Sequence, residues 1–540
     1  MAAKSLQPNR VPNGGLIDRT RSVRFTFDGV DYGGYAGDTL ASALLANGVH
    51  LVGRSFKYHR PRGILTAGSE EPNALVELRE GARLEPNTRA TMVELFDGMS
   101  ARSQNRWPSL EFDVMAVNSL LAPFFAAGFY YKTFMWPSAF WEKVYEPLIR
   151  RAAGLGRASR LPDPDAYEKA WAHCDVLVVG AGPTGLMAAL AAARAGTRVI
   201  LADEDFQLGG RLLVERLTLD DMPAAEWAKC VLDELASMPN VRLMPRTTVF
   251  GVYDQGTYGA IERTGDHSRT PSPFAARQKL WRIVAKRCVL AAGALERPVA
   301  FANNDLPGVM LAGAVRAYVT RFGVMPGQRV VVFTACDDGW QTADALAAAG
   351  ARVVVVDPRD GPQSDGAARD YEVTRGVVVR ALGGRRIESV EVRDINGNVR
   401  KLSCDLLAVS NGWNPSVHLT CHHGAKPVWR SDLHAFVAEA VPPGMSVGGA
   451  AAGHMSTREA LSDGVRLGTE AACAAGIEAP ASVVLPSVVP DDSARVSPVW
   501  SVTGGKGKAF VDFQNDVTTS DIALAAREGY RSVENLKRYT

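Results

Sequence analysis

The chain has 540 residues, enough for roughly three to four domains with several cores. Hydrophobic residues make up 46% of it and charged residues 22%, which excludes a disordered or coiled-coil protein, and the net charge of +2 gives no reason to expect a nucleic-acid partner. Its seven cysteines form no CxxC pair, which argues against a disulfide framework or a cysteine metal cage and favours the reducing cytoplasm.

The first hundred residues have the pattern of a small α+β module. The run Val23–Phe27 predicts a strand, and Leu40–Ala46 predicts a short helix. Asp38 or Thr39 can cap the start of this helix, and Gly48 ends it. The first 30 residues carry no apolar stretch of the kind that a secretory signal needs, so we do not expect export.

Residues 101–170 are expected to form an aromatic-rich linker or interface segment. The apolar stretch from Val114 to Tyr131 is interrupted by polar residues, proline and glycine. It therefore predicts burial against protein rather than a membrane span, and no membrane partner is expected. The run from Phe129 to Trp141 is dense in aromatic side chains, which suits a contact surface between subunits. An aromatic-rich linker that folds onto its own domain explains the same pattern equally well.

The segment Cys174–Gly185 has the pattern of a buried strand that leads into a phosphate-binding turn. Gly180 allows the tight turn, Gly182 lets the backbone approach a pyrophosphate, and Gly185 lets the next helix pack on the strand. The helix formers Leu186–Ala195 follow, so free N–H groups and a positive dipole end face the anion. The pattern predicts a dinucleotide-binding site.

An acidic cluster follows the second strand of this unit. Strand Arg198–Ala202 ends at Asp203, about 20 residues after the first glycine, where an acid meets a ribose hydroxyl in such sites. Asp203, Glu204 and Asp205 would repel a 2′-phosphate, and the cluster offers it no arginine. The cluster therefore favours NAD over NADP.

The choice between NAD and FAD depends on a late segment, Met445–Gly453. Flavoproteins with two dinucleotide domains share the opening fingerprint and the Gly209-Gly210 pair, and they usually close the FAD site with a late Gly-Asp. Here Ala450 stands where that aspartate would hold the ribityl chain, and an alanine accepts no hydroxyl hydrogen bond. NAD is therefore favoured over FAD in this pocket.

The strand–helix–strand pattern repeats further along the chain. Strand Arg329–Phe333, helix Gln341–Ala349 and strand Arg352–Asp357 form a second Rossmann-like unit. Its turn, residues 334–340, keeps one glycine and places two aspartates where phosphates would sit, so it should repel phosphate. We expect this repeat to retain its packing role and to hold no ligand, which leaves one nucleotide per chain.

Four segments resemble the alpha subunit of heterotetrameric sarcosine oxidase, and the similarity spans essentially the whole chain. They are Tyr58–Ala74, Ala127–Met135, Glu296–Met310 and Asp512–Val517. In related amine and opine oxidase subunits the first segment looks like a plant-type ferredoxin module with cluster cysteines, and the tail resembles an iron–sulfur-binding module.

The cluster ligands of both modules are missing from this sequence. Leu65–Asn73 contains no cysteine, and neither Asp512 nor Gln514, near the positions of the tail's ligands, can replace one. We therefore expect both modules to persist as scaffolds without a [2Fe–2S] cluster.

The patterns and the resemblance together predict an α/β fold. Its core is two dinucleotide-binding domains, Rossmann-like and of the glutathione reductase type, with an amino-terminal ferredoxin-like α+β module that lacks a cluster. The expected limits are 1–100 for this module, 101–170 for the aromatic segment, 171–300 with 411–476 for the NAD-binding domain, 301–410 for the degenerate second domain, and 477–540 for a linker and a small helical module.

The resemblance also implies the cofactors and partners. NAD contacts would fall on Thr184, Asp203, Glu204, Asp205, Arg211, Val249, Ala450, Met455 and Thr457. Sarcosine would be oxidised at FAD on a beta-type partner, FMN would lie between the alpha and beta subunits, and smaller gamma- and delta-type subunits would complete the complex. This chain is then expected to carry no catalytic residue and no metal ligand.

Two further functions stay open at this point. The chain could serve an N-methylglutamate or opine dehydrogenase complex, or act as a non-catalytic scaffold that contains NAD. Family members continue into a folate-binding domain resembling the glycine-cleavage T protein, which these 540 residues do not include, so folate chemistry is not expected from them.

Overall fold

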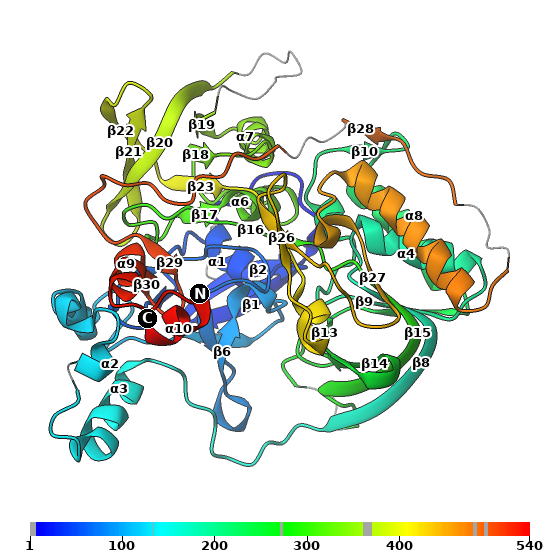
Figure 1. Ribbon diagram of the computed structural model, residues 1–540, viewed down its shortest axis with the longest axis horizontal. Coiled ribbons are helices and arrows are strands. Elements are labelled where there is room, and N and C mark those ends of the chain that lie inside the picture. The colour runs from blue at the N-terminus through cyan, green and yellow to red at the C-terminus, as the bar shows by residue number, and fades with distance from the viewer. Residues whose placement is uncertain (1–6, 133, 271–273, 360–369, 479–482, 491–494) are drawn as a thin grey trace.

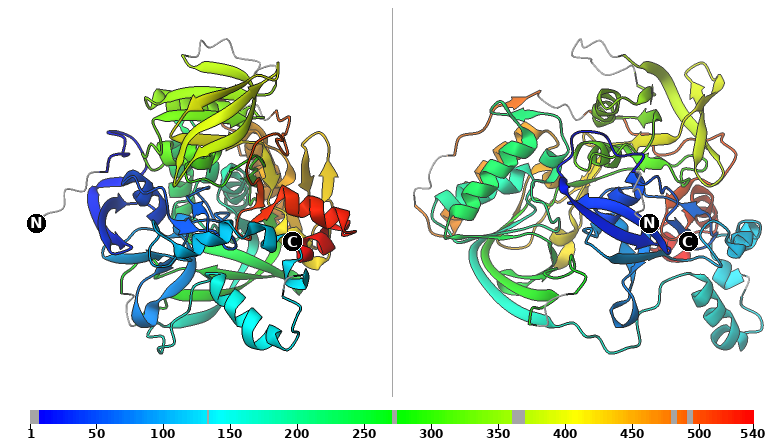
Figure 2. Two further views of the ribbon diagram at one scale, coloured as in Figure 1. Left: turned by 90° about the vertical axis from the view of Figure 1, so that its left-hand side faces the viewer. Right: turned by 180° about the vertical axis from the view of Figure 1, so that it is seen from behind.

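The computed structural model describes residues 7–132, 134–270, 274–359, 370–478, 483–490 and 495–540. Figure 1 shows an amino-terminal module at the centre of the molecule, the first dinucleotide-type domain on the right and the second at the upper left. The carboxyl-terminal module lies beside the amino-terminal one, so segments from the two ends of the chain are neighbours in space (Figure 2).

The amino-terminal module is a five-stranded sheet in the order β2-β1-β7-β5-β6 with one helix. Its elements are β1 (Asp18–Phe27), β2 (Val30–Ala36), α1 (Leu40–Ala46), the hairpin β3 (Gly53–Arg54) and β4 (Pro61–Arg62), β5 (Leu75–Leu78), β6 (Glu85–Arg89) and β7 (Met99–Ser103). Helix α1 starts where Thr39 accepts a hydrogen bond from the Ser42 N–H at 3.1 Å, and Gly48 follows its end at φ +79°. The predicted strand and capped helix are confirmed.

The segment after this module consists of short helical turns. They are Val114–Ser119, Ala122–Phe125, α2 (Phe129–Lys132), a π-helical turn at Trp141–Tyr145 and α3 (Glu146–Ala152). The predicted burial is wrong for much of the stretch, because Leu120 is 80% and Phe124 62% exposed. Each turn is too short to bury an apolar stripe. No helix in the described ranges has the length and apolar character that crossing a bilayer requires.

The first dinucleotide-type domain is built on the sheet β12-β9-β8-β15-β14-β13, with β27 also paired to β15. Its elements are β8 (Tyr167–Val179), α4 (Pro183–Arg194), β9 (Val199–Ala202), α5 (Ala224–Ser237), β12 (Val241–Met244), β13 (Thr247–Tyr253), β14 (Thr257–Glu262), β15 (Gln278–Leu290), β27 (Met445–Val447) and α8 (Thr457–Ala474). Val176 and Val178 of β8 pack against the helices, and Leu177 and Val179 pack against the β13–β15 meander. Alternate residues of one buried strand therefore fill two layers of core.

The second dinucleotide-type domain has the sheet order β17-β23-β18-β19-β20-β21-β22. Its elements are β17 (Val309–Leu311), α6 (Ala312–Thr320), β18 (Arg329–Thr334), α7 (Asp338–Ala348), β19 (Arg352–Asp357), β20 (Glu372–Gly383), β21 (Ile387–Asp394), β22 (Val399–Ser403) and β23 (Leu406–Ser410). The antiparallel pair β16 (Ala294–Glu296) and β24 (Trp413–Pro415) joins the two domains. The predicted strand–helix–strand repeat is thus present.

Smaller elements connect these parts. Strand β10 (Thr218–Leu219) lies between β11 (Met222–Pro223) and β28 (Val488–Val489) in a small sheet, and β25 (Val428–Arg430) forms a hairpin with β26 (Ala435–Val437). The carboxyl-terminal module consists of β29 (Phe510–Asp512), β30 (Val517–Thr518), α9 (Thr519–Arg527) and α10 (Val533–Tyr539).

One apolar core runs through three of these regions. Phe25 and Leu44 of the amino-terminal module, Tyr318 and Val332 of the second dinucleotide-type domain, and Phe510 of the carboxyl-terminal module belong to it, and all are nearly fully buried. Burial of this shared surface is the main force that fixes the module against the second dinucleotide-type domain.

A buried carboxylate holds the two ends of the chain together. Asp516 accepts hydrogen bonds from the N–H groups of Lys57 at 2.8 Å and Tyr58 at 3.0 Å, and it pairs with Arg62. Arg62, 1% exposed, also pairs with Asp305 at 2.6 Å. The contact therefore joins three regions of the fold.

We expect the substitution Asp516→Ala to lower the free energy of unfolding by about 3–5 kcal/mol, because it leaves a buried guanidinium half-paired and two N–H groups without an acceptor. Urea denaturation measures the change. Asp512→Ala is the matched control, since the Asp512 side chain accepts hydrogen bonds from Gln514 and Asn515 of its own turn. Equal effects of the two substitutions would contradict this account.

Candidate functional site

The phosphate-binding turn has the geometry that its three glycines predict. Gly180 adopts φ +99°, and a Cβ on it would lie 2.3 Å from the Ala291 carbonyl oxygen. A Cβ on Gly185 would lie 1.8 Å from the Gly180 carbonyl oxygen, so only glycine allows this approach of helix and strand. Among the described residues other than its chain neighbours, no heavy atom lies within 4 Å of a Cβ built on Gly182. Gly182 thus faces open space, where a pyrophosphate can approach the backbone.

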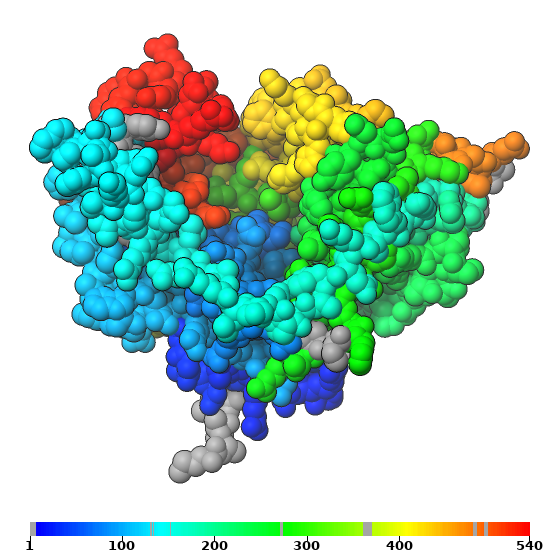
Figure 3. All heavy atoms as spheres, turned by 90° about the horizontal axis from the view of Figure 1, so that it is seen from below, coloured from blue at the N-terminus to red at the C-terminus, as the bar shows by residue number. Residues whose placement is uncertain are grey.

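A cavity of about 1420 Å³ begins at this turn. It exceeds the roughly 300–1,000 Å³ of ordinary ligand pockets, which suits an extended ligand. Of the predicted residues, those that line it are Gly180, Gly182, Thr184, Asp203, Glu204, Asp205, Arg211, Val249, Ala450 and Met455. Gly185 and Thr457 lie behind the wall. Figure 3 shows the surface hollowed between the carboxyl-terminal module on one side and the first dinucleotide-type domain on the other.

Asp203 holds the turn from the end of β9. Its carboxylate accepts hydrogen bonds from the Ala181 N–H at 2.6 Å and the Asp205 N–H at 2.8 Å. Burial, with smaller contributions from Asp205 and Glu204, raises the pKa of Asp203 to about 6. The residue therefore shapes the turn as well as offering further lone pairs to a ribose.

Two arginines from distant parts of the sequence reach the acidic cluster. Arg321 pairs with Asp205 through both terminal nitrogens, at 2.6 and 2.8 Å, and Arg263 donates to the Glu204 carbonyl oxygen. Ser69 of the amino-terminal module donates to the Glu204 carboxylate at 2.6 Å. The expectation that the cluster offers no arginine is wrong, because chain folding brings in arginines that sequence neighbourhood does not show.

A second network sits at the start of α8. Arg211 donates to the carboxylate of Glu215 and to the Met455 carbonyl oxygen, and the Thr457 hydroxyl donates to Glu215 at 3.2 Å. Arg211 and Thr457 thus meet through Glu215, which the sequence did not indicate, and Met455 joins them through Arg211. No motif marks Glu215, and its partner Thr457 is 242 residues away.

Ala450 lies in a short 3₁₀ turn, Gly449–Ala452, and lines the cavity. Gly449 adopts φ +60°, and a Cβ on it would lie 2.1 Å from the Thr184 hydroxyl oxygen. The Gly449 N–H donates to Asp463 of α8 at 2.9 Å. The turn is therefore packed tightly on Thr184, and its carboxylate partner comes from α8 rather than from position 450.

The turn of the second domain is filled by the protein's own side chains. Asp337 pairs with Arg359 at 3.0 Å and with Arg495 at 3.1 Å. Asp357, at the end of β19, pairs with Arg359 at 2.8 Å and accepts the Trp340 indole N–H at 2.9 Å. The predicted repulsion of phosphate is therefore offset at Asp337, because two arginines pair with this aspartate.

A buried acid lies where the two domains join. Glu296 accepts hydrogen bonds from the Gly313 N–H at 2.7 Å and from the Ser410 hydroxyl, and the Cys336 thiol lies 3.1 Å from that hydroxyl. Burial, with Asp338 nearby, raises the pKa of Glu296 to about 8. Burial therefore favours the protonated form of Glu296.

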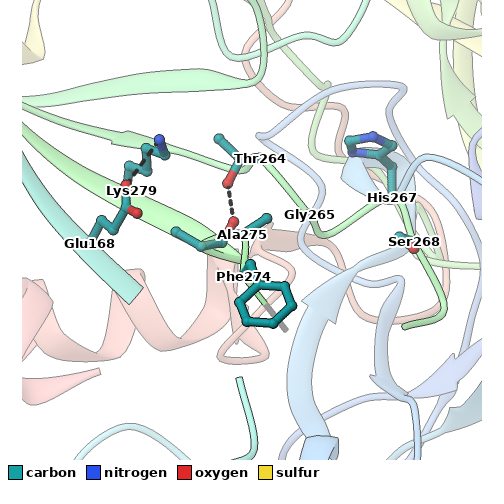
Figure 4. A pocket seen from close by; sticks show the side chains of 9 residues that line it. Glu168, Thr264, Gly265, His267, Ser268, Phe274, Ala275 and Lys279 are labelled. Carbon is teal, nitrogen blue, oxygen red and sulfur yellow. Dashed lines mark hydrogen bonds and ion pairs between the residues drawn. The ribbon is translucent and has the colours of Figure 1, made fainter. Parts of the chain in front are cut away.

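A smaller cavity of about 410 Å³ is lined mainly by the loop between β14 and β15. Figure 4 shows Lys279 paired with Glu168, at 2.9 Å, and Phe274 at the surface. The Thr264 hydroxyl donates to the Ala276 carbonyl at 2.6 Å. These polar groups bind each other, and none of the predicted site residues lies there.

Family comparisons match the chain in three places. A family described as pyridine nucleotide-disulphide oxidoreductase matches residues 174–430, a 2Fe-2S iron-sulfur cluster binding domain matches residues 20–106, and a sarcosine oxidase A3 domain matches residues 506–540. Residues 20–106 and 506–540 contain no cysteine. The predicted α/β fold with an amino-terminal ferredoxin-like module is confirmed.

One solved structure shares the fold of the chain, and one curated protein is similar to part of its sequence. The crystal structure of L-proline dehydrogenase from P. horikoshii shares the fold, with a TM-score of 0.61 and 20% identity over 97% of this chain and 88% of that chain. An opine oxidase protein from Agrobacterium tumefaciens (strain Ach5), the A subunit of that enzyme, is 26% identical over 48% of this chain and 57% of its own length.

Greater similarity is found with two proteins named as the alpha subunit of sarcosine oxidase. The one from Rhizobium meliloti (strain 1021) is 53% identical over 98% of this chain and 54% of its own length. The one from Corynebacterium sp. (strain U-96) is 37% identical over 98% of this chain and 52% of its own length. The chain spans about half the length of these relatives. Over nearly all of its residues, the chain is thus a homologue of the sarcosine oxidase alpha subunit.

Proposed function

We propose that the chain is the NAD-binding, alpha-type subunit of a multi-subunit sarcosine oxidase, an oxidoreductase that demethylates sarcosine to glycine. The observation that carries the proposal is the open face of Gly182 at the mouth of a cavity whose walls contain ten of the twelve predicted site residues. The relatives named as sarcosine oxidase alpha subunits support the activity, and they are more similar to this chain than the opine oxidase protein is.

Two features of the site favour NAD over the related nucleotides. Ala450 offers no carboxylate to a ribityl chain, which disfavours FAD. The acidic side chains of Asp203, Glu204 and Asp205 disfavour a 2′-phosphate. Arg321 does not reverse this preference, because its guanidinium is already paired with Asp205.

The oxidation itself is assigned to partner subunits. In this proposal FAD is held by a beta-type partner, FMN lies at the interface with that partner, and smaller gamma- and delta-type subunits complete the assembly in the cytoplasm. Exposed apolar side chains support a partner surface on the aromatic segment, where Trp107, Phe112 and Trp136 are each more than 60% exposed. The residues of this chain then bind and orient the nucleotide.

The first experiment is mass spectrometry of the nucleotide that acid denaturation releases from the purified chain. NAD without flavin would support an alpha-type protein whose flavins belong to its partners. FAD in a one-to-one ratio would contradict the argument from Ala450 and make the chain itself a flavoprotein.

Asp203→Ala is expected to weaken NAD binding at least 100-fold, about 3 kcal/mol, because it removes a ribose acceptor and frees the Ala181 N–H that shapes the turn. Titration calorimetry measures the change. Asp254→Ala is the control, because Asp254 is an exposed carboxylate of the same domain. Unchanged NAD content in Asp203→Ala would sink the assignment of this residue.

A further inference from the structure

The inner end of the cavity is walled by an ion pair from the second domain. Arg316 of α6 and Asp338, the first residue of α7, both line it. Arg316 donates to the Asp338 carboxylate at 2.8 Å and to the Asp338 carbonyl oxygen at 3.0 Å. Arg316 is 3% and Asp338 9% exposed, so both charges are largely withdrawn from water.

Each member of this pair keeps one polar atom without a partner. Among the described residues, neither Arg316 Nε nor Asp338 Oδ2 makes a hydrogen bond, although both are buried. A buried donor or acceptor left in this state costs about 1–3 kcal/mol. Two residues of one cavity wall thus hold a buried donor and a buried acceptor that the described protein groups leave unpaired.

The ion pair of Arg316 and Asp338 is placed here at the nicotinamide end of a bound dinucleotide. The ribose acids at the end of β9 mark the adenosine end, and Gly182 with the start of α4 marks the pyrophosphate. The same cavity is also lined by Ala292, Gly313, Arg316 and Asp338. The network of Arg211, Glu215 and Thr457 is close by, since Glu215 attracts Arg316 electrostatically.

The opposite charges of Arg316 and Asp338 determine which chemical group of a ligand fits between them. A carboxylate would gain from Arg316 but would be repelled by Asp338 at short range, and a cation would meet the opposite conflict. A primary carboxamide is neutral and carries both an N–H donor and a carbonyl acceptor. It can donate to Asp338 Oδ2 and accept from Arg316 Nε.

We propose that Arg316 and Asp338 form a carboxamide-recognition site, so that the cavity selects a nicotinamide ring over its carboxylate analogue. The inference rests on the proposed NAD binding and adds the residues that determine specificity at the nicotinamide end. Residues of the second dinucleotide-type domain would then contact the nicotinamide end of the nucleotide that is bound to the first.

Competition binding with NAD, nicotinic acid adenine dinucleotide and ADP-ribose tests the site. The first two ligands differ only in carboxamide against carboxylate, and ADP-ribose lacks the ring. We expect NAD to bind at least tenfold more tightly than either of the others. Equal affinity of the protein for NAD and its carboxylate analogue would overturn the inference while leaving the proposed function intact. If none of the three binds, the proposed function fails, and this inference with it.

Asp338→Asn supplies the matched variant. Because it removes the charge that repels a carboxylate, we expect the preference for NAD over the carboxylate analogue to fall at least fivefold. Asp337→Asn is the control, since Asp337 pairs with Arg359 and Arg495 and lies outside the cavity lining. An unchanged preference in Asp338→Asn would overturn the inference. If that variant does not fold, the relative affinities of the three ligands for the unmodified protein still test the inference.

Discussion

Gly182→Ala is expected to fold normally and to lose its nucleotide. Beyond its chain neighbours, a methyl group at this position would meet no heavy atom of the described residues within 4 Å, and Gly182 has φ −75°, which alanine adopts readily. The same methyl group would occupy the space through which a pyrophosphate reaches the backbone. We expect NAD affinity to fall at least 100-fold, about 3 kcal/mol, with less than about 1 kcal/mol lost in stability of the nucleotide-free protein. Calorimetric titration and thermal unfolding measure the two quantities separately.

Gly185→Ala, three residues further on, provides the contrast. Its methyl group would lie 1.8 Å from the Gly180 carbonyl oxygen, so strand and helix must move apart. This variant is expected to lose about 1–3 kcal/mol or more of stability even without nucleotide. If both variants proved equally stable, or if Gly182→Ala kept its nucleotide, the assignment of a separate task to each glycine would be wrong.

Glu296→Gln is expected to make the protein more stable at alkaline pH. The pKa of Glu296 is raised from 4.5 to about 8, so this acid favours the folded state fully below about pH 4.5 and loses that contribution as the pH rises through 8. Glutamine is neutral at every pH and keeps an acceptor for the Gly313 N–H. Its advantage should grow above pH 4.5 and level off above pH 8, at about 3–5 kcal/mol.

Thermal unfolding of both proteins across pH 5 to 9.5 measures this difference. Glu388→Gln is the control, because Glu388 is exposed on β21 of the second domain, and its curve should run parallel to that of the unmodified protein. A parallel curve for Glu296→Gln would mean that the buried acid is already ionised at neutral pH, contrary to its burial between the two domains.

The sequence was most informative where a local pattern fixes local geometry. The strand, turn and helix around Gly180–Gly185, the capped helix after Thr39 and the second unit from Arg329 all lie where spacing and propensity predicted them. The tasks of Gly180 and Gly185 could be predicted because each follows from backbone contacts inside one strand–turn–helix unit.

What escaped prediction depends on long-range contacts. Arg321 is 116 residues from Asp205, and Glu215 meets Thr457 across 242 residues, so no local pattern could pair them. Exposure along residues 114–125 was missed for a related reason. Whether an apolar stretch is buried depends on which surfaces pack against it, and hydrophobicity alone does not specify those surfaces.

The amino-terminal module contributes one wall of the proposed nucleotide cavity. Ser69 and Met92 of this module line the cavity, and the Ser69 hydroxyl binds the Glu204 carboxylate beside the adenosine end. The same module is anchored to the second domain by a common apolar core. A bound nucleotide therefore has a wall on that side that cannot move independently of the rest of the protein. Release of the nucleotide past this wall would then require the module and the second domain to move together.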